Sequence, residues 1–490
     1  MNENEGKLID DIMQNALEAF DKYNKAQKDL RASFLNEIAI QIELHREKLV
    51  PVAMEESHLP EGRLQGELSR TVNQLKMFAD LVQEGSWVEA AIDNGNPQRK
   101  PMPKPDTRKM LCPVGPVIIF GASNFPFAFS TAGGDTASAL ASGSTVVIKG
   151  HPAHTHTSEM IFEAMKIAQQ VAHMPEHTIQ HISNGSFTVG KDLVQHPITA
   201  GVGFTGSFKG GRALMDYASA RKTPIPVYAE MGSVNPVVFY PEYLAQNATE
   251  LVKKLAASIT LGMGQFCTNP GLILAIDGPG LHQFIDGLKA GIEAAVPQDM
   301  LHRGIHDNYC QAVKKIRDKK DIEIIATASQ LSTGIQAMPL VGKINADAFL
   351  ENEYLQEEVF GPYSLLVICK NTGELKDVLT QIDGQLTTTL MATENDMSVH
   401  QDIFRVQQKI AGRILVNDVP TGVEVCSSMI HGGPYPSTSD GRSTSVGTTA
   451  IRRWVRPICY QGFPQQFLPD ELKDTNPYKI WRLVDNEWKM

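Results

Sequence analysis

One cysteine of the chain stands in a context suited to covalent chemistry. Cys267 lies in the run GQFCTN (264–269), a loop sequence between apolar segments in which a thiol can be both exposed and held in position. The thiolate is the reactive form of such a residue. A single cysteine is more often a small buried hydrophobic residue, and we interpret the other five in that way: Cys112, Cys310, Cys369, Cys426 and Cys459.

Length and composition limit the classes of protein that need be considered. A chain of 490 residues is too long for one compact core, so two or three domains are expected. Its net charge of −10 disfavours nonspecific binding to nucleic acid. Six cysteines without a CxxC pair predict neither a disulfide framework nor a zinc ribbon, which favours the cytoplasm. We expect no signal peptide and no transmembrane segment, because the N-terminus is acidic and the uncharged stretch 113–134 is broken by Pro and Gly.

The elements that would position the cysteine alternate in type. The first hundred residues predict helices with charged faces and no catalytic cluster, and the polar, Pro-rich stretch 94–108 predicts an extended arm. Short apolar strands then alternate with helices of small residues. The strands are expected at PVIIFG (116–121), STVVIKG (144–150), TIQHIS (178–183) and AGVGFTG (200–206). This rhythm predicts a parallel sheet with helices on both faces.

A second α/β block extends from about Asn235 to about Asn417. Its clearest strands are GLILAI, YSLLVICK and GRILVND. A Gly/Ser/Thr-rich segment (431–449) and a basic, aromatic stretch with Arg452, Arg453 and Arg456 follow. We interpret these arginines as partners in ion pairs between subunits or at the edge of the core, with a place near a substrate mouth as an alternative.

Six segments give the chain a family resemblance: FGASNFPF (120–127), VVIKGHPA (146–153), GFTGS (203–207), AEMGSVNP (229–236), GQFCTN (264–269) and EEVFGP (357–362). In this order and spacing the chain resembles the aldehyde dehydrogenase superfamily over nearly its whole length. The resemblance implies an α/β fold of two parallel-sheet domains with an oligomerisation arm, in a homodimer or homotetramer. The implied divisions are an NAD(P)-binding domain at 1–234, with an arm segment at about 94–108, a catalytic domain at 235–430, and an oligomerisation arm and tail at 431–490.

The resemblance also assigns catalytic roles. Cys267 matches the nucleophile, Glu230 the general base, and Asn124 the amide that holds the oxyanion together with the backbone N–H of Cys267. Oxidation of an aldehyde needs a soft nucleophile, preorganised donors for the oxygen of the tetrahedral adduct, and a base to activate water for hydrolysis of the thioester. A carboxyl group in a partly apolar pocket can have its pKa raised toward neutrality, and we expect this of Glu230.

For NAD or NADP, the resemblance implies six contacts: Lys149, Gly206, Ser207, Gly232, Glu358 and Phe360. The usual GxGxxG fingerprint is absent, and a Gly-rich turn before a helix would point N–H groups and Ser207 at the pyrophosphate. Pro152 stands where many NAD-specific members have a glutamate that binds the adenosine ribose. Without that negative charge a 2′-phosphate is not repelled, so the sequence favours NADP. No metal site is expected, and His151, His154 and His156 are interpreted as capping or solvent-facing residues.

Several activities remain open within this resemblance. The segments VVIKGHPAHTHTSEM and LPDELKDTNP are similar to the α-ketoglutaric semialdehyde branch, which implies oxidation of 2,5-dioxopentanoate to 2-oxoglutarate. NADP-dependent relatives that oxidise fatty or general aldehydes are the alternative. A CoA-acylating enzyme would share Cys267 but commonly lacks the base, and a non-catalytic binding protein tends to lose the nucleophile or the amide. Glu230 and Asn124 therefore favour a hydrolytic dehydrogenase of a small-molecule aldehyde.

Overall fold

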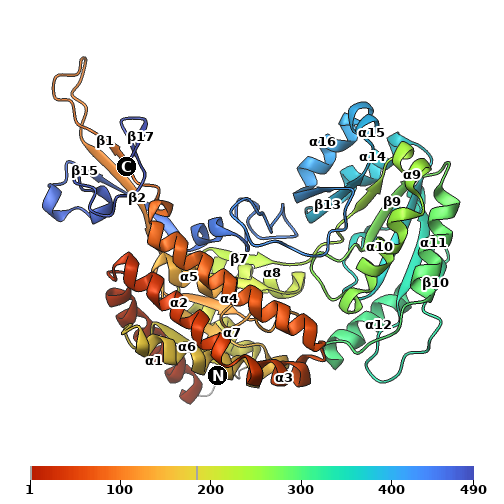
Figure 1. Cartoon of the computed structure of the whole chain (residues 1–490), viewed down its shortest axis with the longest axis horizontal. Helices are drawn as coiled ribbons and strands as arrows, with labels where there is room; N and C mark the ends of the chain where they lie inside the picture. Colours follow the sequence, from red (N-terminus) through yellow and green to blue (C-terminus); the bar gives the residue numbers. More distant parts are fainter. Residues whose placement is uncertain (1–2, 184–185) are drawn as a thin grey trace.

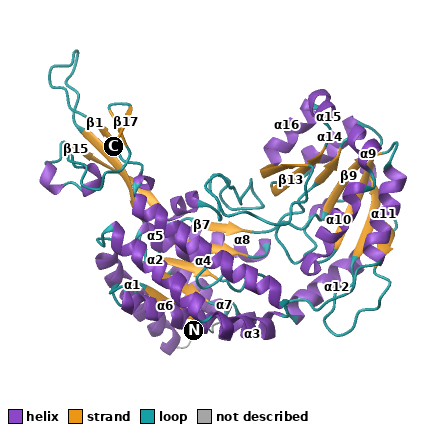
Figure 2. Cartoon of the chain, in the orientation of Figure 1, coloured by secondary structure: helices purple, strands orange, loops and turns teal. Residues whose placement is uncertain are grey.

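Three β-sheets organise the protein, whose computed structural model describes residues 3–183 and 186–490. Two of the sheets form the centres of separate α/β lobes, and the third projects from the first lobe with the C-terminus beside it (Figures 1 and 2). This arrangement confirms the α/β fold expected from the alternation of strands and helices. Among the described helices, none is long and apolar enough to cross a membrane.

The N-terminal residues form four helices that cover the first lobe: α1 (Glu3–Tyr23), α2 (Lys28–Leu44), α3 (Arg46–Ser57) and α4 (Glu61–Glu84). Apolar side chains of α2 and α4 are buried in one cluster with residues of the first sheet, such as Val117 and Val146. The helical expectation for this region is confirmed. The charged face of α4 is partly turned inward, however, because Glu67 is buried at 5% exposure.

The first sheet is parallel throughout, in the order β5 (Ile179–Ile182), β4 (Val146–Lys149), β3 (Val117–Phe120), β6 (Gly201–Thr205) and β7 (Val227–Glu230). Its connecting helices are α5 (Gly134–Ser142), α6 (Thr155–Val171), α7 (Phe187–Gln195) and α8 (Phe208–Ser219). Parallel neighbours need crossover helices, so both faces of the sheet are covered and its strands are apolar runs. Four of these strands were expected from the sequence, and β7 is the addition.

The second sheet has the order β10 (Glu323–Thr327), β11 (Leu340–Asn345), β12 (Tyr363–Cys369), β9 (Leu272–Ile276), β8 (Val237–Phe239), β13 (Gln385–Met391) and β14 (Ala411–Val416). All neighbours are parallel except β10 and β11. Its helices are α9 (Pro241–Asn247), α10 (Glu250–Thr260), α11 (Leu281–Glu293), α12 (Arg303–Arg317), α13 (Ala346–Leu350), α14 (Thr372–Gln381), α15 (Glu394–Val399) and α16 (Gln401–Ile410).

The projecting sheet joins segments from both ends of the sequence. Its order is β15 (Val455–Gln461), β2 (Thr107–Pro113), β1 (Ala91–Asp93), β16 (Arg482–Val484) and β17 (Glu487–Lys489). The loop between β1 and β2 extends beyond the sheet (Figure 1) and is largely exposed, as expected for the Pro-rich stretch. Short 3-10 helices complete the described elements: η1 (Ser86–Val88), η2 (Pro152–His154), η3 (Leu261–Gly264), η4 (Glu353–Gln356), η5 (Thr448–Trp454), η6 (Gln465–Phe467) and η7 (Asp470–Leu472).

Between β14 and β15 the chain returns to the first lobe. Thr438 forms an antiparallel bridge with Glu230 at the end of β7. The buried Arg453 donates from Nη1 to Asp135 Oδ1 at 3.0 Å, and the indole of Trp454 donates to Ser138 Oγ at 2.8 Å. Residues 438–454 therefore pack on the first lobe before the chain enters the projecting sheet, whereas Gly432 to Tyr435 lie against the second lobe at Gly384 and Gly412.

Candidate functional site

A cleft of about 1650 Å³ separates the two lobes and contains every residue that the sequence assigned to a site. Its lining includes all nine: Asn124, Lys149, Gly206, Ser207, Glu230, Gly232, Cys267, Glu358 and Phe360. In the first lobe these residues end or follow parallel strands. The carboxyl ends of such strands meet at one edge of a sheet, where open α/β proteins bind ligands.

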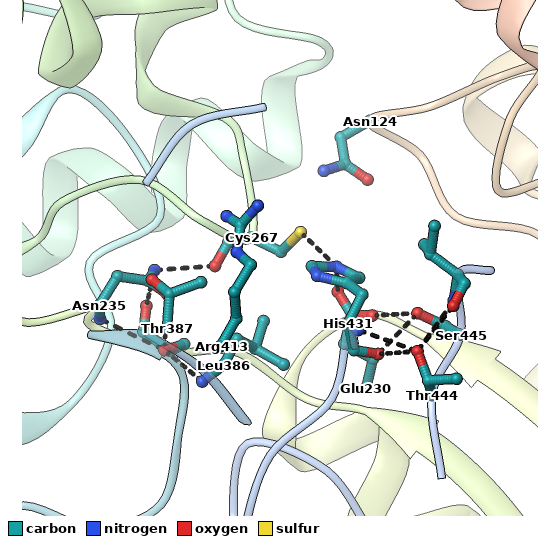
Figure 3. A network of polar contacts seen from close by, with 12 residues as sticks. Asn124, Glu230, Asn235, Cys267, Leu386, Thr387, Arg413, His431, Thr444 and Ser445 are labelled. Atoms are coloured by element: carbon teal, nitrogen blue, oxygen red, sulfur yellow. Dashed lines mark hydrogen bonds and ion pairs between the residues drawn. The ribbon is translucent and has the colours of Figure 1, made fainter. Parts of the chain in front are cut away.

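The loop that carries Cys267 is fixed from both sides. Gly264 has φ +61°, and a Cβ there would lie 2.2 Å from the carbonyl oxygen of Gly361, so only glycine permits this approach. The side chain of Asn235 donates from Nδ2 to the backbone oxygens of Cys267 and Asn269, both at 2.9 Å. These contacts hold the half-buried thiol at the floor of the cleft (Figure 3).

A histidine that the sequence analysis missed joins the thiol to the carboxylate. His431 Nε2 lies 3.3 Å from Cys267 Sγ and 3.1 Å from Glu230 Oε1, and Ser445 Oγ donates to Glu230 Oε2 at 3.1 Å. Figure 3 shows the three side chains converging from different segments. His431 and Ser445 belong to the Gly/Ser/Thr-rich segment, which we had interpreted as an arm. The available signal was a lone histidine directly before a Gly-Gly pair.

The hydrogen bonding of His431 favours one tautomer. Its Nδ1 is buried without a hydrogen-bond partner in the described structure, whereas Nε2 faces a carboxylate. An orphaned buried N–H is rarer than an unfilled acceptor. The proton therefore belongs on Nε2, which donates to Glu230.

The expected rise in the pKa of Glu230 is wrong. Burial does act to raise it, but the electrostatic influence and hydrogen bond of His431, with hydrogen bonds from Cys267 and Ser445, hold the pKa of Glu230 below its usual value. Burial first, and then the neighbouring charge of Glu230, raise the pKa of the Cys267 thiol well above its usual value. A proton is accordingly held on sulfur, and the ionised carboxylate beside it can accept that proton.

Asn124 lies near the thiol without contacting it. Its Nδ2 donates to the backbone oxygen of Gln265 at 3.2 Å, which leaves the second amide hydrogen free. Nothing described accepts a hydrogen bond from the backbone N–H of Cys267. The buried carboxylate of Glu67 fixes the loop after Asn124, because its Oε1 accepts the N–H groups of Phe127 and Ala128 at 2.8 and 3.0 Å. The two donors that an oxyanion needs are thus both available.

Residues at the far part of the cleft have local partners. Lys149 Nζ donates to the carbonyl oxygen of Gly150 at 2.8 Å, and burial lowers the pKa of Lys149. Ser207 is the N-cap of α8 and accepts the N–H of Gly210 at 3.2 Å, so its hydroxyl hydrogen is free. The N–H of Gly206 donates to the carbonyl oxygen of Glu230 at 3.0 Å and is not available to a ligand.

Gly232 and Glu358 approach each other closely. Gly232 has φ +112°, and a Cβ at this position would lie 2.6 Å from Glu358 Oε2. The side chain of Glu358 is exposed to the cleft, but desolvation by the surrounding protein raises its pKa to about 8. The charge of Glu230 adds to this rise, and the hydrogen bond from the N–H of Ser233 opposes it. Glycine at position 232 therefore leaves room for this carboxyl group beside the site.

The histidines after β4 do not form a shared site. His151 Nδ1 accepts the N–H of Ala153 at 3.1 Å as the cap of η2, and the exposed His156 faces Glu56. His154 is buried, with Nε2 2.8 Å from the carbonyl oxygen of Ala122, so the solvent-facing interpretation is wrong for it. Three side chains of kinds that can bind a metal do lie together elsewhere, at Glu230, Cys267 and His431. One ligand atom from each lies within 4.8 Å of the other two.

The C-terminal arginines lie in structural contacts. Arg452 pairs with Glu89, Arg453 pairs with Asp135 inside the first lobe, and Arg456 lies on the exposed strand β15. The alternative that placed these residues near the substrate mouth is not what the structure shows.

Comparison with known proteins gives a consistent picture. The model of the aldehyde dehydrogenase family matches residues 1–454. The chain is 45% identical to "Alpha-ketoglutaric semialdehyde dehydrogenase 2" of Azospirillum brasilense, over 96% of this chain and 90% of that protein. It is 44% identical to "Alpha-ketoglutaric semialdehyde dehydrogenase" of Acinetobacter baylyi, over 97% of this chain and 90% of that protein.

A solved structure shares the fold. A double mutant of betaine aldehyde dehydrogenase from Staphylococcus aureus, in complex with NAD+, superimposes with a TM-score of 0.78 at 19% identity, covering 93% of this chain and 89% of that one. The family match over residues 1–454 and the two relatives at 44–45% identity show that the protein belongs to the aldehyde dehydrogenase family.

Proposed function

We propose that the protein oxidises 2,5-dioxopentanoate to 2-oxoglutarate with NAD(P). The observation that carries this proposal is identity of 44–45% to two α-ketoglutaric semialdehyde dehydrogenases over almost the whole of both chains. The contact of Cys267 with His431, and of His431 with Glu230, supports it chemically. These groups are of the types needed to bind an aldehyde covalently and to hydrolyse the resulting thioester.

Each residue of the site then has a defined task. The Cys267 thiol loses its proton to Glu230, and the sulfur adds to the aldehyde carbon to give a thiohemiacetal. Asn124 Nδ2 and the backbone N–H of Cys267 stabilise the negative oxygen. NAD(P), when bound, supplies the acceptor of the hydride whose loss leaves a thioester on Cys267. After the proton has left the site, Glu230 takes a proton from water, and the attacking oxygen displaces the thiolate to give the carboxylic acid.

The cleft fits a dinucleotide. It reaches Cys267 at one end, Lys149 and Pro152 also line it, and Gly232 keeps open the space that a side chain would fill beside Glu358. Lys149, Gly206, Ser207, Gly232, Glu358 and Phe360 would hold the cofactor. We favour NADP, because Lys149 and Pro152 both line the cleft and Pro152 places no carboxylate there to repel a 2′-phosphate.

The projecting sheet supports assembly into a homodimer or homotetramer. Strand β15 lies at its edge, where unpaired backbone groups can pair with another chain. Aromatic side chains are exposed on the same part of the molecule, including Phe467 and Trp488, at 67% and 66% exposure. Within the segment 431–490, the part from Val455 onward fits this role in assembly. Residues 1–234 and 235–430 would then form the cofactor and catalytic domains. All six cysteines are free thiols, which suits the cytoplasm.

Purified enzyme tests the activity directly. The rise in absorbance of reduced nicotinamide is followed with 2,5-dioxopentanoate, and 2-oxoglutarate is assayed independently in the product. We expect one 2-oxoglutarate for each cofactor reduced, without CoA. A higher kcat/KM for long alkyl aldehydes would favour a fatty-aldehyde enzyme instead, and strict dependence on CoA would identify an acylating dehydrogenase.

A further inference from the structure

Three arginines surround the thiol from outside the cofactor cleft. Arg63 and Arg70 lie two turns apart on one face of α4, and Arg413 lies on β14 of the second sheet. Each guanidinium interacts electrostatically with Cys267. None of the three lines the cleft that contains the cofactor residues. They therefore approach Cys267 from outside the part of the cleft that the proposed cofactor residues line.

All three side chains retain buried donors without acceptors in the described structure: Arg63 Nη1, Arg70 Nε and Nη2, and Arg413 Nε. A buried charged donor that makes no hydrogen bond is costly, and such groups are uncommon in folded proteins. Several of them around one nucleophile indicate a place for an anion.

Two of the arginines are held in place by other contacts. The guanidinium of Arg63 lies over the rings of Phe125 and Phe266, at 4.8 and 4.5 Å from their centroids, and its Nη2 donates to the carbonyl oxygen of Asn124 at 2.6 Å. Arg413 donates from Nη1 to the carbonyl oxygen of Gly422 at 2.8 Å. These two can supply positive potential but have few donors left.

Arg70 is the exception. Its guanidinium lies 5.6 Å from the ring centroid of Phe129, and that ring lies 6.2 Å from the ring of His431, which contacts Cys267. The two free nitrogens, Nε and Nη2, form one edge of the guanidinium. That edge is a fork whose parallel N–H groups match the two oxygens of a carboxylate.

The carboxylates near Arg70 do not fill this fork. Glu67, Glu424 and Glu230 all interact with it electrostatically. Glu67 Oε1 accepts hydrogen bonds from the loop after Asn124, and Glu230 accepts hydrogen bonds from His431 and Ser445. Two competitors remain among these three: Glu424, which is exposed to solvent, and Glu67 Oε2, which makes no hydrogen bond in the described structure and lies 3.9 Å from Arg63 Nη2.

We infer that Arg70 recognises the distal carboxylate of the aldehyde through two parallel hydrogen bonds from Nε and Nη2. Arg63 and Arg413 add positive potential around it. The inference rests on the proposed function, because it gives the carboxylate of an oxo-acid aldehyde its place in the site. In a five-carbon substrate the aldehyde and carboxylate carbons lie roughly 5 Å apart, which suits an anchor one aromatic ring away from the catalytic histidine.

The test compares substrates that differ in charge. The kcat/KM values of wild type, Arg70→Met and Arg70→Lys are measured for 2,5-dioxopentanoate, 5-oxopentanoate, succinic semialdehyde and uncharged pentanal. In Arg70→Met we expect the preference for the carboxylated aldehyde over pentanal to fall by about 100-fold. Arg70→Lys keeps the charge but loses the fork, so its preference should lie between the other two. Lys76→Met, which removes an exposed charge from the same helix, should leave both values unchanged.

A binding measurement separates recognition from turnover and from folding. Glutarate should protect Cys267 of the wild type against alkylation by iodoacetamide, and this protection should be lost in Arg70→Met, whose thermal unfolding is checked in parallel. If Arg70 is instead paired with Glu424 or Glu67, then Arg70→Met should change all substrates alike, as should Glu424→Gln if Glu424 is the partner, and the inference is overturned.

The outcomes also separate this inference from the proposed function. If wild type prefers a carboxylated aldehyde of another length and Arg70→Met abolishes that preference, the proposed substrate is wrong and the role of Arg70 stands. If wild type prefers 2,5-dioxopentanoate and Arg70→Met keeps the preference, only the role of Arg70 falls. A wild type without any preference for carboxylated aldehydes overturns both.

Discussion

His431 donates to the buried carboxylate of Glu230 at 3.1 Å, across 201 positions of sequence. Burial would otherwise favour the neutral acid, so this contact is what keeps the pKa of Glu230 low. The base of the site is therefore ionised at neutral pH because of a residue from a distant segment.

Replacing His431 should shift the pH dependence of turnover. In His431→Leu the burial of Glu230 is unopposed, so its pKa rises and the acid limb of the kcat profile moves to higher pH. His431→Gln retains an N–H donor and should move the limb less. Steady-state kcat measured from pH 5 to 9 decides this. An acid limb at the same pH in all three proteins would mean that another group sets the ionisation of Glu230.

Glu230→Gln should separate acylation from hydrolysis. Without the negative charge of Glu230 the thiol can lose its proton to solvent, so rapid mixing is expected to show a burst of about one reduced cofactor per site, followed by a stall at the thioester. The neighbouring negative charge is also lost, so the pKa of Cys267 should fall and iodoacetamide should alkylate it faster at neutral pH. Cys267→Ala serves as the control without burst or turnover. Absence of the burst together with slower alkylation would show that Glu230 is required to deprotonate the thiol.

Asn124→Ala should lower kcat by roughly 10²–10³, the loss that follows removal of one oxyanion donor. Asn124→Asp is the matched variant that keeps the shape and removes the donor, and it should be at least as slow. A change below about threefold in Asn124→Ala would show that this amide does not face the oxyanion.

Cofactor choice should depend on Pro152. We expect wild type to use NADP at least as well as NAD, with a preference of no more than about tenfold, because one partly buried lysine is the only cation assigned to the phosphate. Pro152→Glu should shift the ratio of specificity constants toward NAD, by repelling the phosphate and accepting ribose hydrogen bonds. An unchanged ratio would place recognition of the 2′ position elsewhere, with His151 and His302 as the next residues to test.

Local sequence predicted the strands whose side chains are continuously apolar, because burial on both faces of a parallel sheet selects such runs. It did not predict β13, QLTTTLM, although the whole strand is buried. Two of its three threonines are satisfied by distant partners, whereas the hydroxyl of Thr389 makes no hydrogen bond in the described structure. The hydroxyl of Thr387 donates to Asn235 Oδ1 at 2.9 Å, and that of Thr388 donates to the carbonyl oxygen of Pro236 at 3.2 Å. Such pairing is a property of the fold and leaves no local pattern.

The same dependence on distant partners explains why part of the site could not be predicted from the sequence. Cys267, Glu230 and Asn124 lie in short motifs that the family resemblance identifies. His431 and Arg70 have no motif, and their environment depends on contacts between segments far apart in sequence. The sequence predicts charged helix faces without a catalytic cluster in this region. In the structure, however, Arg63, Glu67 and Arg70 share the face of α4 that turns toward the site.

Because the segment after β14 returns to Glu230 in the first lobe, the site is completed late in the synthesis of the chain. During synthesis, Glu230 and Cys267 leave the ribosome long before His431 and Ser445, the two residues that partner the carboxylate. Until those partners arrive, the carboxyl group lacks the hydrogen bonds of His431 and Ser445, and the thiol has no imidazole beside it. The arrangement of Cys267, His431 and Glu230 is therefore complete only after residues 431–445 have been synthesised and have packed beside Glu230.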